Sequence, residues 1–380
     1  MKHSDVVAAY EANGKNQSKT AAQLGIARST VQWHLSQAAI HGEIAPELRL
    51  TPTGFNVKRL TQHVRKEKGE PVLTEEWTQF TPESATYDAT LSAIDEVMKK
   101  HEGIIPVIPQ QVAASNADLA TFYPIIDHHL GLYSWEPETG ANYDLTIAQK
   151  ILRDSLGELV GQAPASDRAV ILNIGDFFHS DSNRNRTERS GNVLDADGRY
   201  TKILEVGIDL QLYAIELALT KHSCVEVRNL PGNHDPYATV ALNSAVRMAF
   251  RNNPRVHVSR DPSPFFFWRF GKVLVGATHG DMIKAVDMPS VMAAYAAKDW
   301  GETEHRYVYL GHVHHKSIGG GERFGATWET FQTLAAKDAW ASQSGYSSGR
   351  SMVAITHHRD SGERYRHTVT IAGPGFKTRG

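Results

Sequence analysis

The sequence has few of the features that mark a secreted, disulfide-bonded or membrane protein. Its 380 residues include one cysteine, Cys224, so the chain forms no internal disulfide and has no cysteine-based zinc site. No apolar run approaches the roughly 18 residues that a membrane span needs. The first residues also lack the apolar core of a signal peptide. These absences predict a cytoplasmic protein that does not contact a membrane.

The charge balance gives no strong indication of a polyanionic partner, because the net charge is -2 at pH 7. Residues 1–70 contain ten Lys or Arg against six Asp or Glu, an excess of four positive charges. A solvated surface explains that excess about as well as DNA binding does. Histidine is abundant instead, at 19 of 380 residues. Since histidine is most useful near its pKa or on a metal ion, the positions of these residues decide what they indicate.

Residues 1–50 are predicted to form a small helical domain that binds nucleic acid. The segment 18–35 resembles a helix-turn-helix, in which the first helix ends at Gly25 and Ile26 fills the corner. Val31 and Leu35 are four residues apart and would face inward on the second helix. A helical module that contacts protein is the alternative. The residues that would face a DNA groove are Arg28, Ser29, Thr30, Gln32 and Trp33.

Residues 51–103 are predicted to form a hairpin and a helical linker. An alternating stretch at 72–80 favours a wing-like hairpin, and residues 82–101 have the apolar spacing of one amphipathic helix. A domain boundary near residue 103 follows, with the main domain at 104–380.

The main domain repeats one pattern, in which a strand-like apolar run ends in polar residues. Helices are predicted at 142–160, 200–222, 238–252 and 288–299. Side chains that follow strands of one sheet meet at its edge, where ligand sites gather. The five runs end in the segments Asp127-His128-His129-Leu130-Gly131, Gly175-Asp176-Phe177-Phe178-His179, Gly232-Asn233-His234-Asp235, His279-Gly280 and Gly311-His312-Val313-His314.

These five motifs, in this order, resemble those of the calcineurin-like metallophosphoesterase superfamily, over roughly residues 120–316. The resemblance implies an α/β (α+β) fold: a sandwich of two mixed sheets, flanked by helices, with a two-metal site. A small helix-turn-helix domain would precede it. Two divalent ions can activate a water molecule and neutralise a phosphate.

The resemblance also implies a ligand set. Asp176 would bridge the two ions, because one carboxylate can offer an oxygen to each. Asp127, His129 and His314 would complete the first site, and Asn233, His279 and His312 the second. An all-oxygen and nitrogen set suits manganese, iron or zinc. We expect Mn²⁺, with Fe²⁺, Zn²⁺ or Mg²⁺ as alternatives.

Three further residues are assigned catalytic roles by the same resemblance. His234 would lie beside the scissile phosphate and protonate the leaving oxygen. Asp235 would orient His234. His179 matches a histidine of SbcD-type DNA repair exonucleases, which have similar Asp-x-His-Leu-Gly and Gly-Asp-x-Phe segments. Other histidines, such as His128 and His357, match no ligand position and are expected at the surface or around the site.

The polar, basic segment 181–200 has two interpretations. It could be a loop at the cleft edge that binds phosphates through residues such as Arg184 and Arg186, or a disordered insertion. The aromatic run 265–270 is expected to pair with 272–277 as a hairpin that contributes to the core. Residues 326–372 are expected to close the second sheet.

The function predicted from these features is a metal-dependent phosphodiesterase that acts on DNA, similar to an exonuclease, in a bacterial cell or a phage-infected host. A phosphomonoesterase or a cyclic-nucleotide or other small-molecule phosphodiesterase is one alternative. A DNA-binding regulator with a non-catalytic metal site is the other. The sequence shows no dimer surface, although related nucleases often form homodimers.

Overall fold

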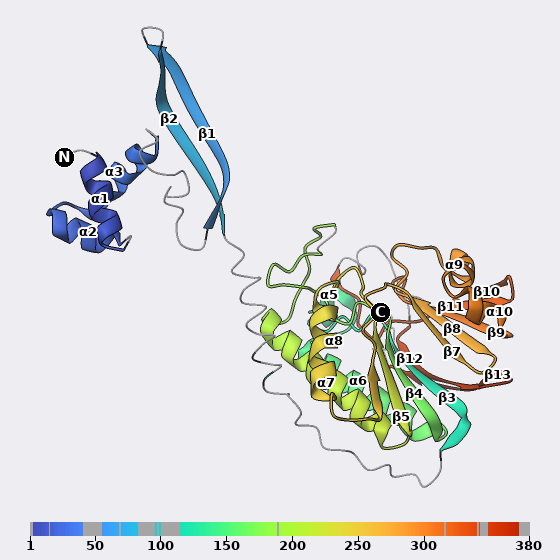
Figure 1. Ribbon diagram of the computed structural model, residues 1–380. Helices are drawn as coiled ribbons and strands as arrows, with labels where there is room; N and C mark the ends of the chain where they lie inside the picture. Colours follow the sequence, from blue (N-terminus) through green and yellow to red (C-terminus); the bar gives the residue numbers. More distant parts are fainter. Residues whose placement is uncertain are drawn as a thin grey trace. The chain divides into compact units, whose positions relative to one another are not determined.

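The computed structural model describes residues 3–14, 16–40, 55–67, 70–82, 96, 99, 115–187, 190–314, 317–339, 342 and 349–371 (Figure 1). The chain divides into two compact units, Met1–Ala89 and Thr90–Gly380. None of the helices in the described ranges is both long and apolar enough to cross a membrane. The helix predicted at 82–101 lies outside the described residues, except for Glu96 and Lys99, which are helical.

The first unit contains three helices and a hairpin. The helices are α1 (His3–Ala12), α2 (Gln17–Leu24) and α3 (Arg28–Ile40). Strands β1 (Phe55–Glu67) and β2 (Glu70–Pro82) pair antiparallel, as the alternation predicts. Helix α2 ends at Gly25, whose φ of 64° requires the left-handed conformation that glycine adopts at little cost. Val31 and Leu35 are buried in a small core, which agrees with their predicted inward orientation.

The second unit is built on a six-stranded sheet in the order β13-β12-β3-β4-β5-β6. Strands β3, β4, β5 and β6 are parallel to one another, and β12 pairs antiparallel with β3. The strands are β3 (Asn116–Ile125), β4 (Ser166–Asn173), β5 (Cys224–Asn229), β6 (Val256–Val258), β12 (Ser351–His358) and β13 (Gly362–Thr370).

A second sheet has the order β10-β11-β9-β8-β7. Strand β7 forms the predicted aromatic hairpin with β8, and β9 lies parallel to both β8 and β11. The expectation that all of residues 326–372 close this sheet is wrong, because β12 and β13 belong to the first sheet. The strands are β7 (Phe266–Phe270), β8 (Val273–Thr278), β9 (His305–Leu310), β10 (Ser317–Arg323) and β11 (Ala326–Thr330).

The two sheets pack against each other and are covered by helices on their outer faces, so the predicted two-sheet sandwich is confirmed (Figure 1). Buried residues from both sheets, including Phe122, Val275 and Ile355, form the layer between them. Three helices cover the outer face of the first sheet: α6 (Leu145–Gln162), α7 (Tyr200–Leu219) and α8 (Ala238–Ala249). The remaining short helices are α5 (Glu136–Thr139), η2 (Ala285–Asp287), α9 (Met288–Tyr295) and α10 (Ala297–Gly301).

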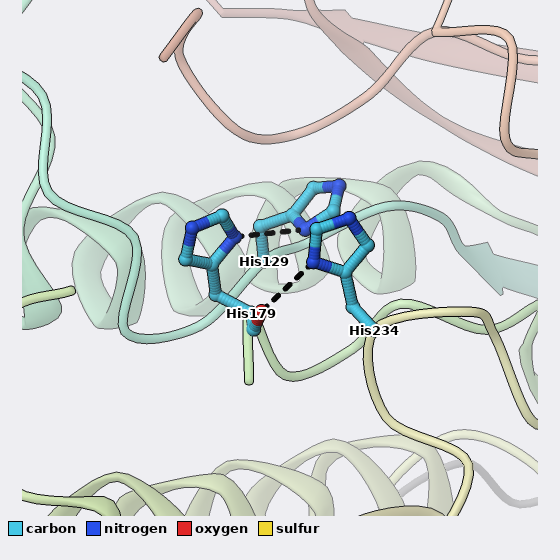
Figure 2. Close-up of side chains that lie close together, drawn as sticks. All are labelled: His129, His179 and His234. Carbon is cyan, nitrogen blue, oxygen red and sulfur yellow. Dashed lines mark hydrogen bonds between the residues drawn. The ribbon is translucent and has the colours of Figure 1, made fainter. Parts of the chain in front are cut away.

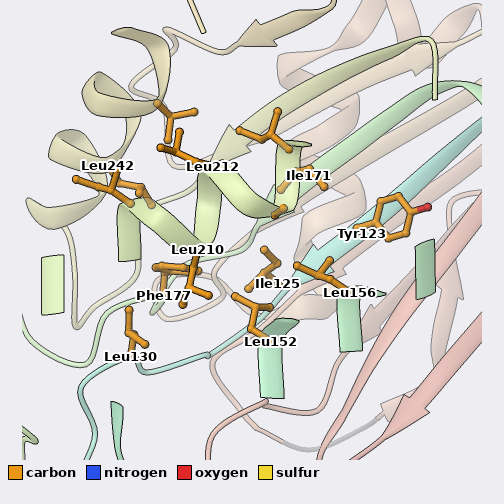
Figure 3. Close-up of a cluster of buried hydrophobic side chains, with 14 of the residues drawn as sticks. Tyr123, Ile125, Leu130, Leu152, Leu156, Ile171, Phe177, Leu210, Leu212 and Leu242 are labelled. Atoms are coloured by element: carbon orange, nitrogen blue, oxygen red, sulfur yellow. The ribbon is translucent and has the colours of Figure 1, made fainter. Parts of the chain in front are cut away.

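The largest apolar cluster lies between the first sheet and its three helices. Tyr123, Ile125 and Ile171 point from the sheet toward Leu152 and Leu156 of α6 (Figure 3). The helix positions repeat every three or four residues, so one side of each helix supplies the buried side chains. This packing fixes the strands whose ends hold the polar motifs.

The polar side of the same layer includes a buried histidine, His222. Its pKa determines how the stability of the fold depends on pH in acid. The His222 ring is hydrogen-bonded at both nitrogens, 2.8 Å from the Tyr123 hydroxyl and 2.8 Å from Ser166 Oγ. Burial lowers the pKa of His222 to about 4. The unfolded chain, with a histidine pKa near 6.5, therefore binds this proton more readily than the folded chain does. The stabilising contribution is complete above about pH 6.5 and is lost as the pH falls toward 4.

We expect His222→Gln to lose stability at pH 7.5 but to respond less to acid than the wild type. Between pH 6.5 and 4.5, its free energy of unfolding should fall less steeply, by up to about 1.4 kcal/mol per pH unit. Urea unfolding at several pH values measures this, and the exposed His257→Gln is the control. Equal slopes for His222→Gln and wild type would show that His222 does not titrate as described.

Candidate metal centre

The five polar motifs meet at one edge of the sandwich, because each follows the carboxyl end of a strand. Asp127 and His129 follow β3, Asp176 follows β4 and Asn233 follows β5. From the second sheet, β8 leads to His279, and β9 leads to His312 and His314. The parallel pairs β3–β4–β5 and β8–β9 bring these ends side by side. The seven predicted ligands are therefore gathered by the two sheets together.

Among the described residues, three groups of histidine and aspartate could hold a metal ion, and the first consists of Asp127, His129 and His314. The facing ligand atoms of this group all lie within 4.8 Å of one another. His314 Nε2 lies 3.2 Å from His129 Nε2 and 3.9 Å from Asp127 Oδ2. These are the three residues predicted to complete the first site.

The second group consists of Asp176, His279 and His312. His279 Nε2 lies 3.2 Å from Asp176 Oδ2 and 3.1 Å from Asn233 Oδ1. The other ring nitrogen, Nδ1, is 3.0 Å from the Ile174 carbonyl oxygen, and a hydrogen bond there leaves Nε2 as the atom that faces the ligands. Asn233 is thus placed beside the second group, as predicted.

Asp176 stands between the groups. Its Oδ2 atom lies 3.2 Å from His279 Nε2 of the second group and 3.9 Å from His129 Nε2 of the first. Its other oxygen, Oδ1, accepts a 2.8 Å hydrogen bond from the His234 backbone nitrogen. This position is the one that a carboxylate bridging two ions requires.

The backbone at these residues is unusual. Among the described residues, seven other than glycine have a positive φ between 46° and 65°, and five of the seven are predicted ligands. Each such residue costs on the order of 1–3 kcal/mol, and strain of this kind concentrates at functional sites. Packing of the two sheets must hold the loops in place against this cost. The five are Asp127, His129, Asp176, His312 and His314.

The oxygen and nitrogen atoms of the predicted ligands fit a pair of divalent metal ions. Asp127 is fully buried, yet its Oδ1 atom has no hydrogen-bond partner among the described residues. A buried carboxylate oxygen without a partner is unfavourable unless a cation or a proton satisfies it. His129 Nε2 and His314 Nε2 face each other at 3.2 Å, so in the absence of a metal ion one of these rings donates a hydrogen bond to the other. Histidine and carboxylate ligands without thiolate suit manganese, iron or zinc.

Without a metal ion, Asp176 and His279 form an ion pair. Burial alone would raise the pKa of Asp176, but the attraction of His279 and its hydrogen bond hold that pKa well below its usual value. Burial would likewise lower the pKa of His279, whereas Asp176, Asp127 and the Ile174 carbonyl raise it to about 10. Because a metal ion needs the neutral imidazole, binding at His279 must release a proton.

Asp235 has a different role from the one predicted. The sequence interpretation gives it the task of orienting His234, but no hydrogen bond joins their side chains. Instead, its Oδ1 accepts hydrogen bonds from the backbone nitrogens of Asp176 (3.1 Å) and Gly232 (2.9 Å), and its Oδ2 accepts one from Phe178 (3.1 Å). Burial and the nearby Asp176 raise the pKa of Asp235 to about 6. Asp235 thus fixes the loop that holds Asp176.

Gly232 allows this close approach of the two loops. A Cβ atom at this position would lie 2.0 Å from Asp176 Oδ1 and 2.3 Å from the Asp176 backbone nitrogen. No side chain fits there, which is the structural reason for glycine before Asn233.

His129, His179 and His234 form a third cluster of side chains (Figure 2). His179 Nδ1 is 3.3 Å from His129 Nδ1, and the His179 carbonyl oxygen is 2.8 Å from His234 Nδ1. The rings of His179 and His234 are stacked, with centroids 5.2 Å apart. The predicted catalytic pair is therefore brought together beside the first group. Since Nδ1 of His234 is occupied, Nε2 is the atom left for a substrate.

The segment 181–200 forms a tied loop, and its described residues do not fit the disordered alternative. Asp181 accepts hydrogen bonds from the backbone nitrogens of Tyr237 and Ala238 at the start of α8 (2.9 and 2.7 Å). Asn183 Oδ1 accepts one from the first residue of α7 (2.9 Å), and Arg186 forms a bridge with Val193. The guanidinium of Arg186 donates to Gly191, whereas Arg184 is exposed.

This loop forms one wall of a cavity over the second group. The cavity has a volume of about 380 Å³ and is lined by Thr187, Ser190, Asn233, Asp281 and His312. We call it the central pocket. Thr187, Ser190 and Asp281 were not predicted from the sequence, because no motif distinguishes them and only the folded loops bring them to the ligands.

The other predicted residues lie apart from the ligand cluster. His128 and His357 are fully buried, which excludes the surface position but not the position around the site: His357 Nε2 is 2.8 Å from the Tyr309 hydroxyl, and His128 packs on Phe177. The predicted groove-facing residues lie on α3 of the first unit. Arg28, Ser29, Gln32 and Trp33 are exposed there, and Thr30 is partly buried.

Comparison with known proteins gives no relative by sequence. No family model matches the chain, and no curated protein matches it.

Comparison with solved structures gives several similar chains of low identity. A predicted phosphoesterase from Streptococcus pneumoniae has 11% identity and a TM-score of 0.28, covering 67% of this chain and 98% of that one. A dimetal phosphatase from Danio rerio has 10% identity and a TM-score of 0.36, covering 66% and 99%. A 5'-nucleotidase precursor from Thermus thermophilus has 13% identity and a TM-score of 0.30, covering 67% and 54%. At these TM-scores, the function has to be argued from the site itself.

Proposed function

We propose that the chain is a metal-dependent phosphodiesterase that acts on DNA, similar to an exonuclease, and that its N-terminal helices bind nucleic acid. The observation that supports the metal-dependent reaction is the set of five strained predicted ligands in two groups, with Asp176 of the second group 3.9 Å from His129 of the first. Strain at one residue is common in proteins, but five ligands held this way indicate a site built for a purpose.

Two divalent ions held there would lower the pKa of a bound water molecule and offset the charge of the phosphate. The chain's own groups supply the rest. Asp176 and Asp127 provide the negative charge that holds the ions. The Asn233 amide oxygen is a neutral ligand. His234, fixed through Nδ1 by the His179 carbonyl, presents Nε2 to the leaving oxygen.

The lining of the central pocket favours a diester over a monoester. A phosphate monoester is doubly charged at neutral pH and is usually held by arginine or lysine. The described residues that line this pocket include neither, and they include the carboxylate of Asp281. A diester carries a single negative charge, so it needs less positive charge from the protein and is repelled less by Asp281.

Two basic regions support a nucleic-acid substrate. Helix α3 presents Arg28 and Gln32, four residues apart, on one face, and Trp33 is exposed next to Gln32, so all three are accessible for groove or backbone contacts. In the second unit, Arg184 lies exposed on the loop that borders the central pocket. A strand that leaves the pocket on this side would meet a positive charge.

We expect the purified protein with Mn²⁺ to hydrolyse bis-p-nitrophenyl phosphate at least ten times more efficiently, in kcat/KM, than p-nitrophenyl phosphate. With 5'- and 3'-labelled DNA, it should release short products from strand ends. Chelation by EDTA should abolish both activities. A preference for the monoester would support the phosphomonoesterase alternative. Metal binding without any turnover would support a regulator with a non-catalytic site.

A further inference from the structure

A second cavity lies next to the metal centre and has no role in the reaction described so far. Its volume is about 420 Å³, and it lies between the segment 280–285, which follows β8, and the ends of β9 and β11. We call it the side pocket. Its size falls within the range of roughly 300–1,000 Å³ that is typical of small-molecule sites.

The side pocket continues from the metal centre. Gly280, in its wall, follows the predicted ligand His279, and Gly311 precedes the predicted ligand His312. Asp281 lines both this pocket and the central pocket. A group that is ester-linked to a phosphate at the metal centre can therefore extend directly into the side pocket.

The walls of the side pocket are mainly apolar. They include Met282, Ile283, Leu310 and Val313, and the polar lining residues are Asp281, Lys284 and Thr330. Met282 is 71% exposed and Val313 is 44% exposed, so both present apolar surface at the side pocket. Methionine also makes favourable contacts with aromatic rings.

We propose that the side pocket holds the nucleobase of the nucleotide whose phosphate lies at the metal centre. This inference rests on the proposed function and names the part of the substrate that the site selects. Met282 and Val313 would contact the faces of the base, and Lys284 would donate a hydrogen bond to a ring carbonyl or nitrogen. A sugar or a second phosphate would match these apolar walls less well.

The proposal has a consequence for the form of the DNA. A base in the side pocket cannot be paired or stacked in a duplex, so the nucleotide must be single-stranded, frayed or extruded. The substrate class is therefore a strand with an unpaired nucleotide at the position of cleavage. A cavity of about 420 Å³ has no room for a base pair together with its partner strand.

The test compares two diesters that share one leaving group. Thymidine 5'-(p-nitrophenyl) phosphate carries a base, whereas methyl p-nitrophenyl phosphate does not. We expect the wild type with Mn²⁺ to prefer the thymidine ester in kcat/KM by roughly five- to 100-fold, the range expected for contacts with one base. Met282→Ala and Lys284→Ala should each reduce that ratio at least threefold. The exposed Val240→Ala, on α8, is the control and should keep the wild-type ratio.

A binding measurement without catalysis completes the test. In saturation-transfer NMR with thymidine 5'-monophosphate and EDTA, the base methyl protons should receive more saturation than the sugar protons, and Met282→Ala should remove the difference. Hydrolysis of the methyl ester with no preference for thymidine, or an unchanged NMR pattern in Met282→Ala, would overturn this inference alone. Failure to hydrolyse either ester would overturn the proposed function instead.

Discussion

Asp176→Asn is expected to keep the fold, lose the second metal ion and lose at least about 10³-fold in kcat/KM. Asparagine has the shape of aspartate and tolerates the left-handed backbone that Asp176 adopts, at a φ of 51°. It cannot, however, offer a charged oxygen to both ligand groups. Charge stabilisation by metal ions is worth several kcal/mol, and 1.36 kcal/mol corresponds to a factor of ten in rate.

Three measurements check this prediction. Circular dichroism and urea unfolding establish that the variant is folded, and metal analysis after dialysis against Mn²⁺ gives the number of ions per chain. Asp154→Asn, which changes an exposed carboxylate in a surface ion pair, is the matched control and should keep wild-type metal content and activity. If Asp176→Asn still bound two ions with wild-type affinity, Asp176 would not be the shared ligand.

The gathering of all seven predicted ligands at one edge of the sandwich could be predicted from the sequence, because each follows a strand. An apolar run is short and easy to recognise, and the residue after it lies at the edge of the sheet. The pairing of ligands within the two groups also agrees with the interpretation, since Asp127, His129 and His314 lie together, as do Asp176, His279 and His312. The edge of parallel strands leaves little freedom for other arrangements.

The role of Asp235 could not be found in this way. The sequence places it next to His234, and neighbours in sequence suggest a contact between side chains. In the fold, Pro231 and Gly232 turn the chain so that Asp235 faces the backbone of the Asp176 loop. Two of its three hydrogen-bond donors, the backbone nitrogens of Asp176 and Phe178, lie 59 and 57 positions earlier in the chain, which no local pattern reveals.

Local sequence patterns also could not predict the sheet to which β12 belongs or that the 181–200 loop is ordered. β12 has an apolar sequence that fits either sheet, but its pairing with β3 depends on which strand edge is free after folding. The 181–200 loop is polar and resembles a disordered segment by composition. Its order comes from Asp181 and Asn183, which hydrogen-bond to the first residues of α8 and α7. Such contacts depend on where the helices begin in space.

His234→Gln is expected to bind two metal ions as the wild type does and to lose about 10²–10⁴-fold in kcat on DNA, the usual contribution of a general acid. His234 is not one of the seven predicted ligands; its ring packs edge-on against that of His129, with centroids 4.8 Å apart, and its backbone nitrogen donates to Asp176. Glutamine keeps the backbone contact and approximates the size of the ring, but it cannot transfer a proton at neutral pH.

A comparison of two substrates with different leaving groups can distinguish proton donation by His234 from a structural role of this residue. An alkoxide leaving from DNA needs a proton, whereas p-nitrophenolate leaves readily without one. The loss in kcat for His234→Gln should therefore be large on DNA and less than about tenfold on bis-p-nitrophenyl phosphate. His257→Gln, at an exposed histidine of β6, serves as the matched control. Equal losses on both substrates would mean that His234 positions the phosphate or its loop and does not donate the proton.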